Sequence, residues 1–270
     1  MIATIKAEWR KNRFRPALLV GSGLVAGITV LVYSSNWYLA THPNAAERAV
    51  SIASLYPGQF VNNVMGAAFP VGAAIAIVLG AVLAGSEYSW GTLKTVFTQG
   101  PGRLTTWSGR TIVFTLWMGV LTVILFTMGA AYSAVIAAFN SHTLEWPTLE
   151  AIAKGFGAVW LILTVNGAIG MALGVVLRQS AAAIGVGVVY LLSVEFIAVR
   201  FIDSVSNGDY KWIGDLFVGQ NANALIGQLG GSAAASHITI SAEQAVLVIC
   251  AWLAGLLIVA AGLQRVRDVT

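Results

Sequence analysis

Two polar side chains lie within long apolar segments of this sequence and are candidates for direct contact with a ligand. Glu195 lies in the segment Gln179 to Phe201, and Asn166 lies midway along Gly155 to Leu177. A charge at the centre of a bilayer costs about 2.5–3.5 kcal/mol on insertion scales, so a retained acid favours a functional interpretation. Glu195 is explained equally well if its side chain snorkels to the interface or forms a hydrogen bond between helices. Asn166 is more typical of a helix-to-helix contact. Both are carried forward as candidate substrate-path residues.

The remaining reactive side chains do not combine into a catalytic or metal site. His42, His142 and His237 fall in separate connecting segments without metal-ligand spacing. Cys250 is the single cysteine, so no disulfide can form within the chain, and its apolar surroundings favour a buried thiol. No Ser/His/Asp constellation or pair of catalytic carboxylates can be assembled. We therefore expect neither enzymatic activity nor a metal or cofactor held by this chain.

The stretch from Gly85 to Arg103 carries the most informative pattern. Leu93, Val96 and Phe97 follow a helical i, i+3, i+4 spacing, and Gly100-Pro101 is a helix stop. The spacing predicts a short surface helix from about Thr92 to Gln99. Because a membrane-spanning role does not require apolar side chains there, we expect this helix to rest on the membrane or to enter a groove of a protein partner.

At these residues the sequence resembles the ABC-2 family of ABC exporter permeases. That family has a Glu-Tyr-x-x-Gly-Thr-Leu-Lys/Arg pattern after the second span, followed by a small-residue turn and an arginine. In this sequence the pattern is formed by Glu87, Tyr88, Gly91, Thr92, Leu93, Lys94 and Arg103. The resemblance extends over the chain in its layout of six spans, a basic N-terminal segment and an extended connection before the last span.

The resemblance implies a permease that has no ATPase of its own. A Gly-x-x-x-x-Gly-Lys-Ser/Thr phosphate loop is absent from the sequence. ATP and Mg²⁺ are therefore expected on a separate ABC ATPase subunit, and a second permease copy is expected to complete a homodimer or heterodimer. By resemblance, the predicted helix is a coupling helix that docks into the ATPase. The residues expected to carry this ATPase coupling are Glu87, Tyr88, Thr92, Leu93, Lys94 and Arg103.

The composition requires a lipid environment around these segments. Hydrophobic residues make up 57% of the 270 positions and charged residues only 10%, with a mean hydropathy of +0.80. A water-soluble globule usually has about 25% charged residues, which excludes that class. Six segments are long enough to span a bilayer. They run roughly over residues 17–39, 62–86, 111–140, 155–177, 179–201 and 244–264. We expect a single all-α transmembrane domain over residues 1–270, with a kink at Pro70.

Charge asymmetry predicts the orientation. With six spans both termini share one side, which carries eleven of the fifteen basic residues: Lys6, Arg10, Lys11, Arg13, Arg15, Lys94, Arg103, Arg110, Arg178, Arg265 and Arg267. The other side carries Arg48, Lys154, Arg200 and Lys211. The positive-inside rule then places both termini in the cytoplasm of a cell-membrane protein. A net charge of +4 is explained by these loops and does not require a nucleic-acid partner.

Two further segments have helical patterns. Ile2, Ile5 and Trp9 share one face of the N-terminal segment while its basic residues line another, which predicts an amphipathic helix at the cytoplasmic interface. In residues 203–243, Val218, Ala222, Leu225 and Leu229 recur at helical spacing. That pattern predicts a short helix on or in the outer leaflet, although an ordinary flexible loop fits as well.

The function expected from these features is export of a hydrophobic or amphipathic cargo, such as a drug, antibiotic, lipid or peptide, by alternating access. An ion-coupled secondary transporter is an alternative, but it would ordinarily place acids or broken helices near the membrane midplane. Another alternative is a non-transporting membrane scaffold for a cytoplasmic partner, because the same short helix would serve it.

Overall fold

The fold of this chain is described by a computed structural model that covers residues 2–42, 51–89, 102–206, 210–230 and 240–266. Within these ranges the secondary structure is helical and contains no strand. The α-helices are α1 (Ile2–Asn12), α2 (Pro16–Thr41), α3 (Phe60–Ala67), α4 (Ala73–Ser89), α6 (Arg103–Phe139), α7 (Leu149–Leu177), α8 (Ser180–Val189), α9 (Glu195–Ser206), α10 (Lys211–Gly214), α11 (Val218–Gly230) and α12 (Ala242–Val266). Short 3₁₀ turns, η2 (Ile52–Leu55) and η3 (Pro57–Gln59), precede α3, and π-helical turns η4 (Ala68–Gly72) and η5 (Tyr190–Val194) interrupt two of the spans.

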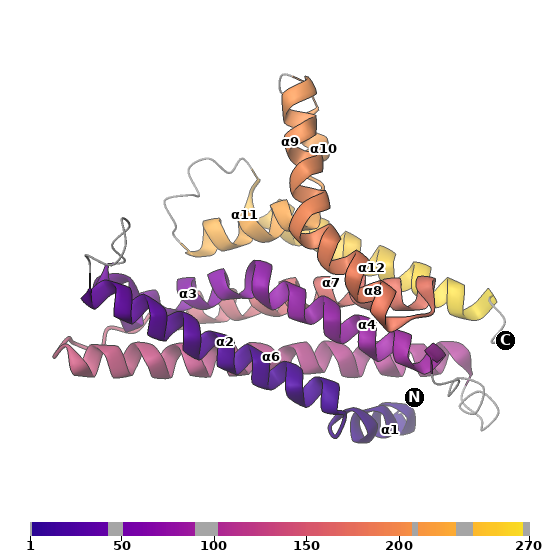
Figure 1. The fold of residues 1–270 in the computed structure, drawn as a ribbon, viewed down its shortest axis with the longest axis horizontal. Helices are drawn as coiled ribbons and strands as arrows, with labels where there is room; N and C mark the ends of the chain where they lie inside the picture. The colour runs from indigo at the N-terminus through magenta and orange to yellow at the C-terminus, as the bar shows by residue number, and fades with distance from the viewer. Residues whose placement is uncertain (1, 43–50, 90–101, 207–209, 231–239, 267–270) are drawn as a thin grey trace.

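Six helical segments of the described chain are long and apolar enough to cross a membrane, which confirms the predicted fold class of a multi-pass membrane protein. They run Pro16–Thr41, Pro57–Tyr88, Arg103–Phe139, Leu149–Leu177, Ser180–Ile202 and Ala242–Val266. Both termini lie at one end of the bundle, at the right of Figure 1. We call this the terminal end; it carries α1, the end of α4, the start of α6 and the end of α12. The opposite end, where α2 ends and α7 begins, is the distal end.

The closest packing in the bundle joins α4 to α7. A Cβ atom on Gly80 would overlap the carbonyl oxygen of Gly167, and one on Gly170 would overlap the carbonyl oxygen of Ile77. Gly174 likewise lies against the backbone of Gly85, with 2.9 Å between its ideal Cβ position and the Gly85 nitrogen. The small-residue spacing at Gly170 and Gly174 therefore lets two backbones touch within one subunit. As a result α7 is the most enclosed of the six spans.

The second span is broken where the sequence predicts a kink. Phe69 has extended backbone angles, φ −139° and ψ 132°, between α3 and α4. Pro70 follows it and cannot donate a backbone hydrogen bond, so the helix cannot continue unchanged through this point. The distal part of the span, α3, is thereby offset from α4, as Figure 1 shows.

The fifth span leaves the bundle, and the chain then returns. It comprises α8, η5 and α9, and in Figure 1 α9 and α10 project away from the other helices. The chain comes back as α11, which packs against α12, α3 and α7. Val218, Ala222 and Leu225 are buried by this packing and Leu229 is partly buried. The predicted helix is therefore confirmed, and its apolar face packs against other helices of the bundle.

The helix boundaries show where sequence prediction was wrong. The third span begins at Arg103 and not at Thr111, so Arg110 lies inside α6 and is not part of a solvated loop. The fourth span begins at Leu149, where the Thr148 hydroxyl accepts a hydrogen bond from the Ala151 backbone N–H at 3.2 Å. In both cases polar residues continue the helix beyond its apolar run, since a helix end is set by capping and packing as well as by hydropathy.

Candidate functional site

The carboxylate of Glu87 lies in the last turn of α4, at the terminal end of the bundle. Glu87 is only 1% exposed to solvent. The two carboxylate oxygens accept hydrogen bonds from different cations: Oε1 from the Lys11 ammonium of α1, and Oε2 from the Arg110 guanidinium of α6. One side chain thus joins three helices at the point where the chain leaves α4.

Further polar groups surround this ion pair. Arg15, between α1 and α2, donates from Nη2 to the Ser86 hydroxyl at 3.0 Å and from Nη1 to the Leu83 carbonyl oxygen at 3.4 Å. Glu8 of α1 lies 3.8 Å from the Lys11 ammonium. We call Glu8, Lys11, Arg15, Glu87 and Arg110 the terminal charge cluster. Three of its members are cationic and two are anionic.

The cluster is electrostatically demanding because much of it is removed from water. Arg110 is 1% exposed, and its Nε and Nη1 atoms have no hydrogen-bond partner among the described residues. Burial lowers the pKa of Arg15 below its usual value, while the charge of Glu87 acts in the opposite direction. Removing one member of a buried ion pair leaves the other uncompensated, which typically costs about 3–5 kcal/mol.

Packing of α1 against α6 supports the cluster. The Trp9 and Trp117 ring centroids are 5.9 Å apart, and Thr4 lies next to Gly109. The buried residues of α1 are Glu8 and Asn12. The predicted N-terminal helix is therefore present, and it turns a mixed face to the bundle: Trp9 of the predicted apolar face packs there beside Glu8 and Asn12, whereas Ile2 is 73% exposed.

The residues predicted for ATPase coupling are divided by the structure. Glu87 is internal, and Tyr88 is partly buried against the hydrophobic core. Arg103 begins α6 and donates from Nη1 to the Arg265 carbonyl oxygen of α12 at 3.3 Å. Thr92, Leu93 and Lys94, together with the predicted helix over residues 92–99, lie outside the described residues. Sequence reasoning missed Lys11, Arg15 and Arg110 as partners of this motif.

Glu195, a candidate substrate-path residue, has a structural partner of its own. It is 4% exposed, and its Oε1 accepts the backbone N–H groups of Gly219 at 2.5 Å and Gln220 at 3.1 Å. These are the second and third residues of α11, where backbone N–H groups have no partner within the helix. The carboxylate also lines a small cavity of about 190 Å³ beside Phe69 and Pro70.

Asn166, the second such candidate, lies in the interior of α7. It is 1% exposed, and its Nδ2 donates to the Ile162 carbonyl oxygen at 2.9 Å, one turn earlier. Its Oδ1 is buried with no hydrogen-bond partner among the described residues. The structure therefore does not bring Asn166 and Glu195 together with the terminal charge cluster.

Comparison with known proteins gives the chain a family. No curated protein matches the sequence. Residues 30–263 match a family model, and this range contains Glu87, Arg110 and Glu195 but begins after Lys11 and Arg15. The family is described as "Protein of unknown function (DUF2705)", and the chain belongs to it.

Proposed function

We propose that this chain is the transmembrane permease subunit of an ABC exporter. A hydrophobic or amphipathic cargo is moved across the cell membrane by alternating access, and a separate ATPase subunit supplies the energy. Two permease copies form the path, and both termini face the cytoplasm. The spans carry few charged side chains, which supports an uncharged or amphipathic cargo, and the excess of basic residues at the terminal end supports the orientation.

The observation that carries the proposal is the position of Glu87. It is the first residue of the coupling motif, and it is tied to Lys11 of α1 and Arg110 of α6. A displacement of the segment that follows α4 therefore acts on three helices at once. Coupling between a nucleotide site and a distant transport path requires a physical element that both sites can bias.

This geometry separates two tasks within the motif. Because Glu87 is enclosed by its partners, it transmits motion and does not touch the ATPase. Docking then falls to Thr92, Leu93 and Lys94, with Leu93 as the apolar anchor that enters a groove of the partner. Tyr88 and Arg103, which flank this segment, hold its two ends against the bundle.

The proposal is tested first by asking whether an adjacent reading frame encodes a phosphate-loop ATPase. Co-purification of the chain with that ATPase follows, and then ATPase assays in proteoliposomes. Leu93→Asp is expected to abolish association, because it places a charge in an apolar contact. Leu144→Asp, at a 57% exposed leucine of the distal end, is the matched control and should leave association unchanged. If the Leu93→Asp chain associates with the ATPase as strongly as the wild-type chain does, the docking role is contradicted.

Transport separates this function from the alternatives. An exporter requires ATP-dependent movement of an amphipathic dye into inverted vesicles, and this movement should stop in a hydrolysis-deficient ATPase variant. Association without any such movement would identify a membrane scaffold. Movement driven by an ion gradient without ATP would identify a secondary transporter.

A further inference from the structure

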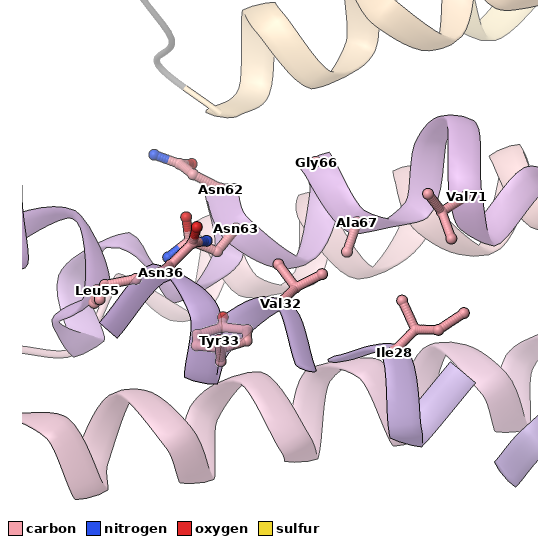
Figure 2. A pocket seen from close by; sticks show the side chains of 10 residues that line it. All are labelled: Ile28, Val32, Tyr33, Asn36, Leu55, Asn62, Asn63, Gly66, Ala67 and Val71. Atoms are coloured by element: carbon pink, nitrogen blue, oxygen red, sulfur yellow. The ribbon is translucent and has the colours of Figure 1, made fainter. Parts of the chain in front are cut away.

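A cavity of about 320 Å³ lies between α2 and the α3–η4 segment, in the distal half of the bundle (Figure 2). Its volume is at the lower end of the range of about 300–1,000 Å³ that is usual for small-molecule sites. It is separate from the terminal charge cluster and from the small cavity beside Glu195, whose lining residues are different.

Each of the two walls of the cavity has a polar residue at one end and an apolar residue at the other. On α2, Asn36 lies at one end and Ile28 at the other. Figure 2 shows Asn63 of the facing wall at the Asn36 end of the cavity and Val71 at the Ile28 end. Eight residues of helix separate Asn36 from Ile28, which corresponds to about 12 Å at 1.5 Å per residue. The cavity therefore has a polar end and an apolar end.

The polar end offers hydrogen bonds without charge. The Asn63 Nδ2 donates to the Ser54 carbonyl oxygen at 2.8 Å, which fixes the orientation of that amide. No hydrogen bond within the described part of the chain engages the Asn36 carboxamide, so its donors and its acceptor remain available. Among the residues that the structure describes, no acidic or basic side chain lines the cavity. A charged head group would be desolvated there without a counter-charge, which disfavours ionised ligands.

A glycine helps to keep the space open. A Cβ atom on Gly66 of α3 would meet nothing within 4 Å. Glycine inside a helix costs about 0.5–1 kcal/mol relative to alanine, and packing against a neighbour does not require it at this position. The missing side chain leaves volume on the wall that faces α2.

We propose that this cavity binds a neutral amphiphile whose hydroxyl or amide head group contacts Asn36 and Asn63 and whose apolar chain extends toward Ile28 and Val71. In its role as a cargo site the inference rests on the proposed export function and names the cargo chemistry. The binding itself requires only this chain and no ATPase.

The test uses the purified full chain in nanodiscs, without ATPase, and a short-chain monoacylglycerol that carries a diazirine in its acyl chain. Cross-linked peptides are identified by mass spectrometry, and unlabelled monoacylglycerol is the competitor. We expect saturable, competable labelling of α2 near Ile28 and of the η4–α4 junction near Val71. The fatty acid and the alkylamine of the same chain length should compete at least about tenfold less well, because their heads are charged.

Two variants and one control locate the binding. Gly66→Leu fills the cavity and should remove the saturable labelling. Asn36→Leu should keep labelling by the chain but remove the preference for the neutral head. Gly23→Leu is the control. Like Gly66, Gly23 of α2 has nothing within 4 Å of its Cβ position, but it does not line the cavity. It should leave labelling unchanged.

The opposite results would overturn the inference. Labelling that does not saturate and spreads over other exposed residues of α2, such as Leu24 and Leu31, would show ordinary lipid contact. Saturable labelling that survives Gly66→Leu would place the ligand elsewhere. Neither result bears on ATPase association, and a failure of ATPase association leaves this binding measurement intact, so the two failures are distinguishable.

Discussion

The Glu195 carboxylate in the fifth span accepts the backbone N–H of Gly219 at the start of α11, so an acid in an apolar segment acts as the cap of a helix that lies elsewhere in the chain. A negative charge at a helix N-terminus is stabilised by the unpaired N–H groups and by the helix dipole. A side chain at position 219 would leave no room for this contact, because an ideal Cβ atom there lies 2.7 Å from Glu195 Oε1. The pair fixes α11 to the span that projects from the bundle.

Glu195→Ala should therefore loosen the start of α11. Loss of an N-terminal cap costs about 0.5–2 kcal/mol, and the buried N–H of Gly219 is left without a partner. Hydrogen–deuterium exchange of the first turn of α11 should become faster, with a smaller effect in Glu195→Gln, which keeps an acceptor. Glu145→Gln, at an exposed position of the distal end, serves as control. Unchanged exchange in Glu195→Ala would show that the cap contributes nothing.

The Glu87–Arg110 pair should behave as a coupled unit. Arg110→Met and Glu87→Gln should each lower the free energy of unfolding by about 3–5 kcal/mol. The first removes one of the two cations that hold the buried Glu87 carboxylate, and the second leaves the buried Arg110 without its counter-charge. The double variant should lose clearly less than the sum of the two. Thermal unfolding of the detergent-solubilised protein measures all three. Additive losses would mean that the two side chains do not interact.

The six spans were predictable, because a run of about 20 apolar residues has the length and composition of a transmembrane helix. The kink predicted at Pro70 and the helix predicted from the Val218–Leu229 pattern are also present, since a missing N–H and a helical repeat are local properties. The start of α6 was not predictable from hydropathy. Residues 103–110 are polar enough to resemble a loop, yet they continue the helix by about two turns, and Arg110 pairs with Glu87 within this extension.

The terminal charge cluster could not be predicted either, because its members are far apart in the sequence. Glu87 was identified through its motif, but its partners Lys11 and Arg110 are 76 and 23 residues away in sequence. Glycine spacing shows the same limit. Gly170 and Gly174 touch the backbone of α4, whereas Gly23 and Gly27 have the same spacing and meet nothing within 4 Å. A spacing permits close approach, but the neighbouring helix decides whether it occurs.

Substitution at the α4–α7 contact should separate these two kinds of glycine. Gly170→Ala forces a methyl group onto the Ile77 carbonyl oxygen and should destabilise the protein by about 1–3 kcal/mol, as overpacking does. Gly23→Ala has open space and should be neutral or slightly stabilising, because alanine is the better helix former by about 0.5–1 kcal/mol. Thermal unfolding gives the comparison. Equal behaviour of the two variants would contradict the close contact.

The orientation of the chain can be measured directly. In a Cys250→Ser background, single cysteines at positions 94 and 142 are labelled in intact cells with a membrane-impermeant maleimide. Lys94→Cys should react only after the cells are opened, whereas His142→Cys, which follows the end of α6 at the distal end, should react in intact cells. The positive-inside rule predicts this result, because eleven of the fifteen basic residues belong to segments that the sequence assigns to the side of the termini. Labelling of Lys94→Cys from outside would place the coupling motif away from ATP, and an ATPase partner at this face would then be excluded.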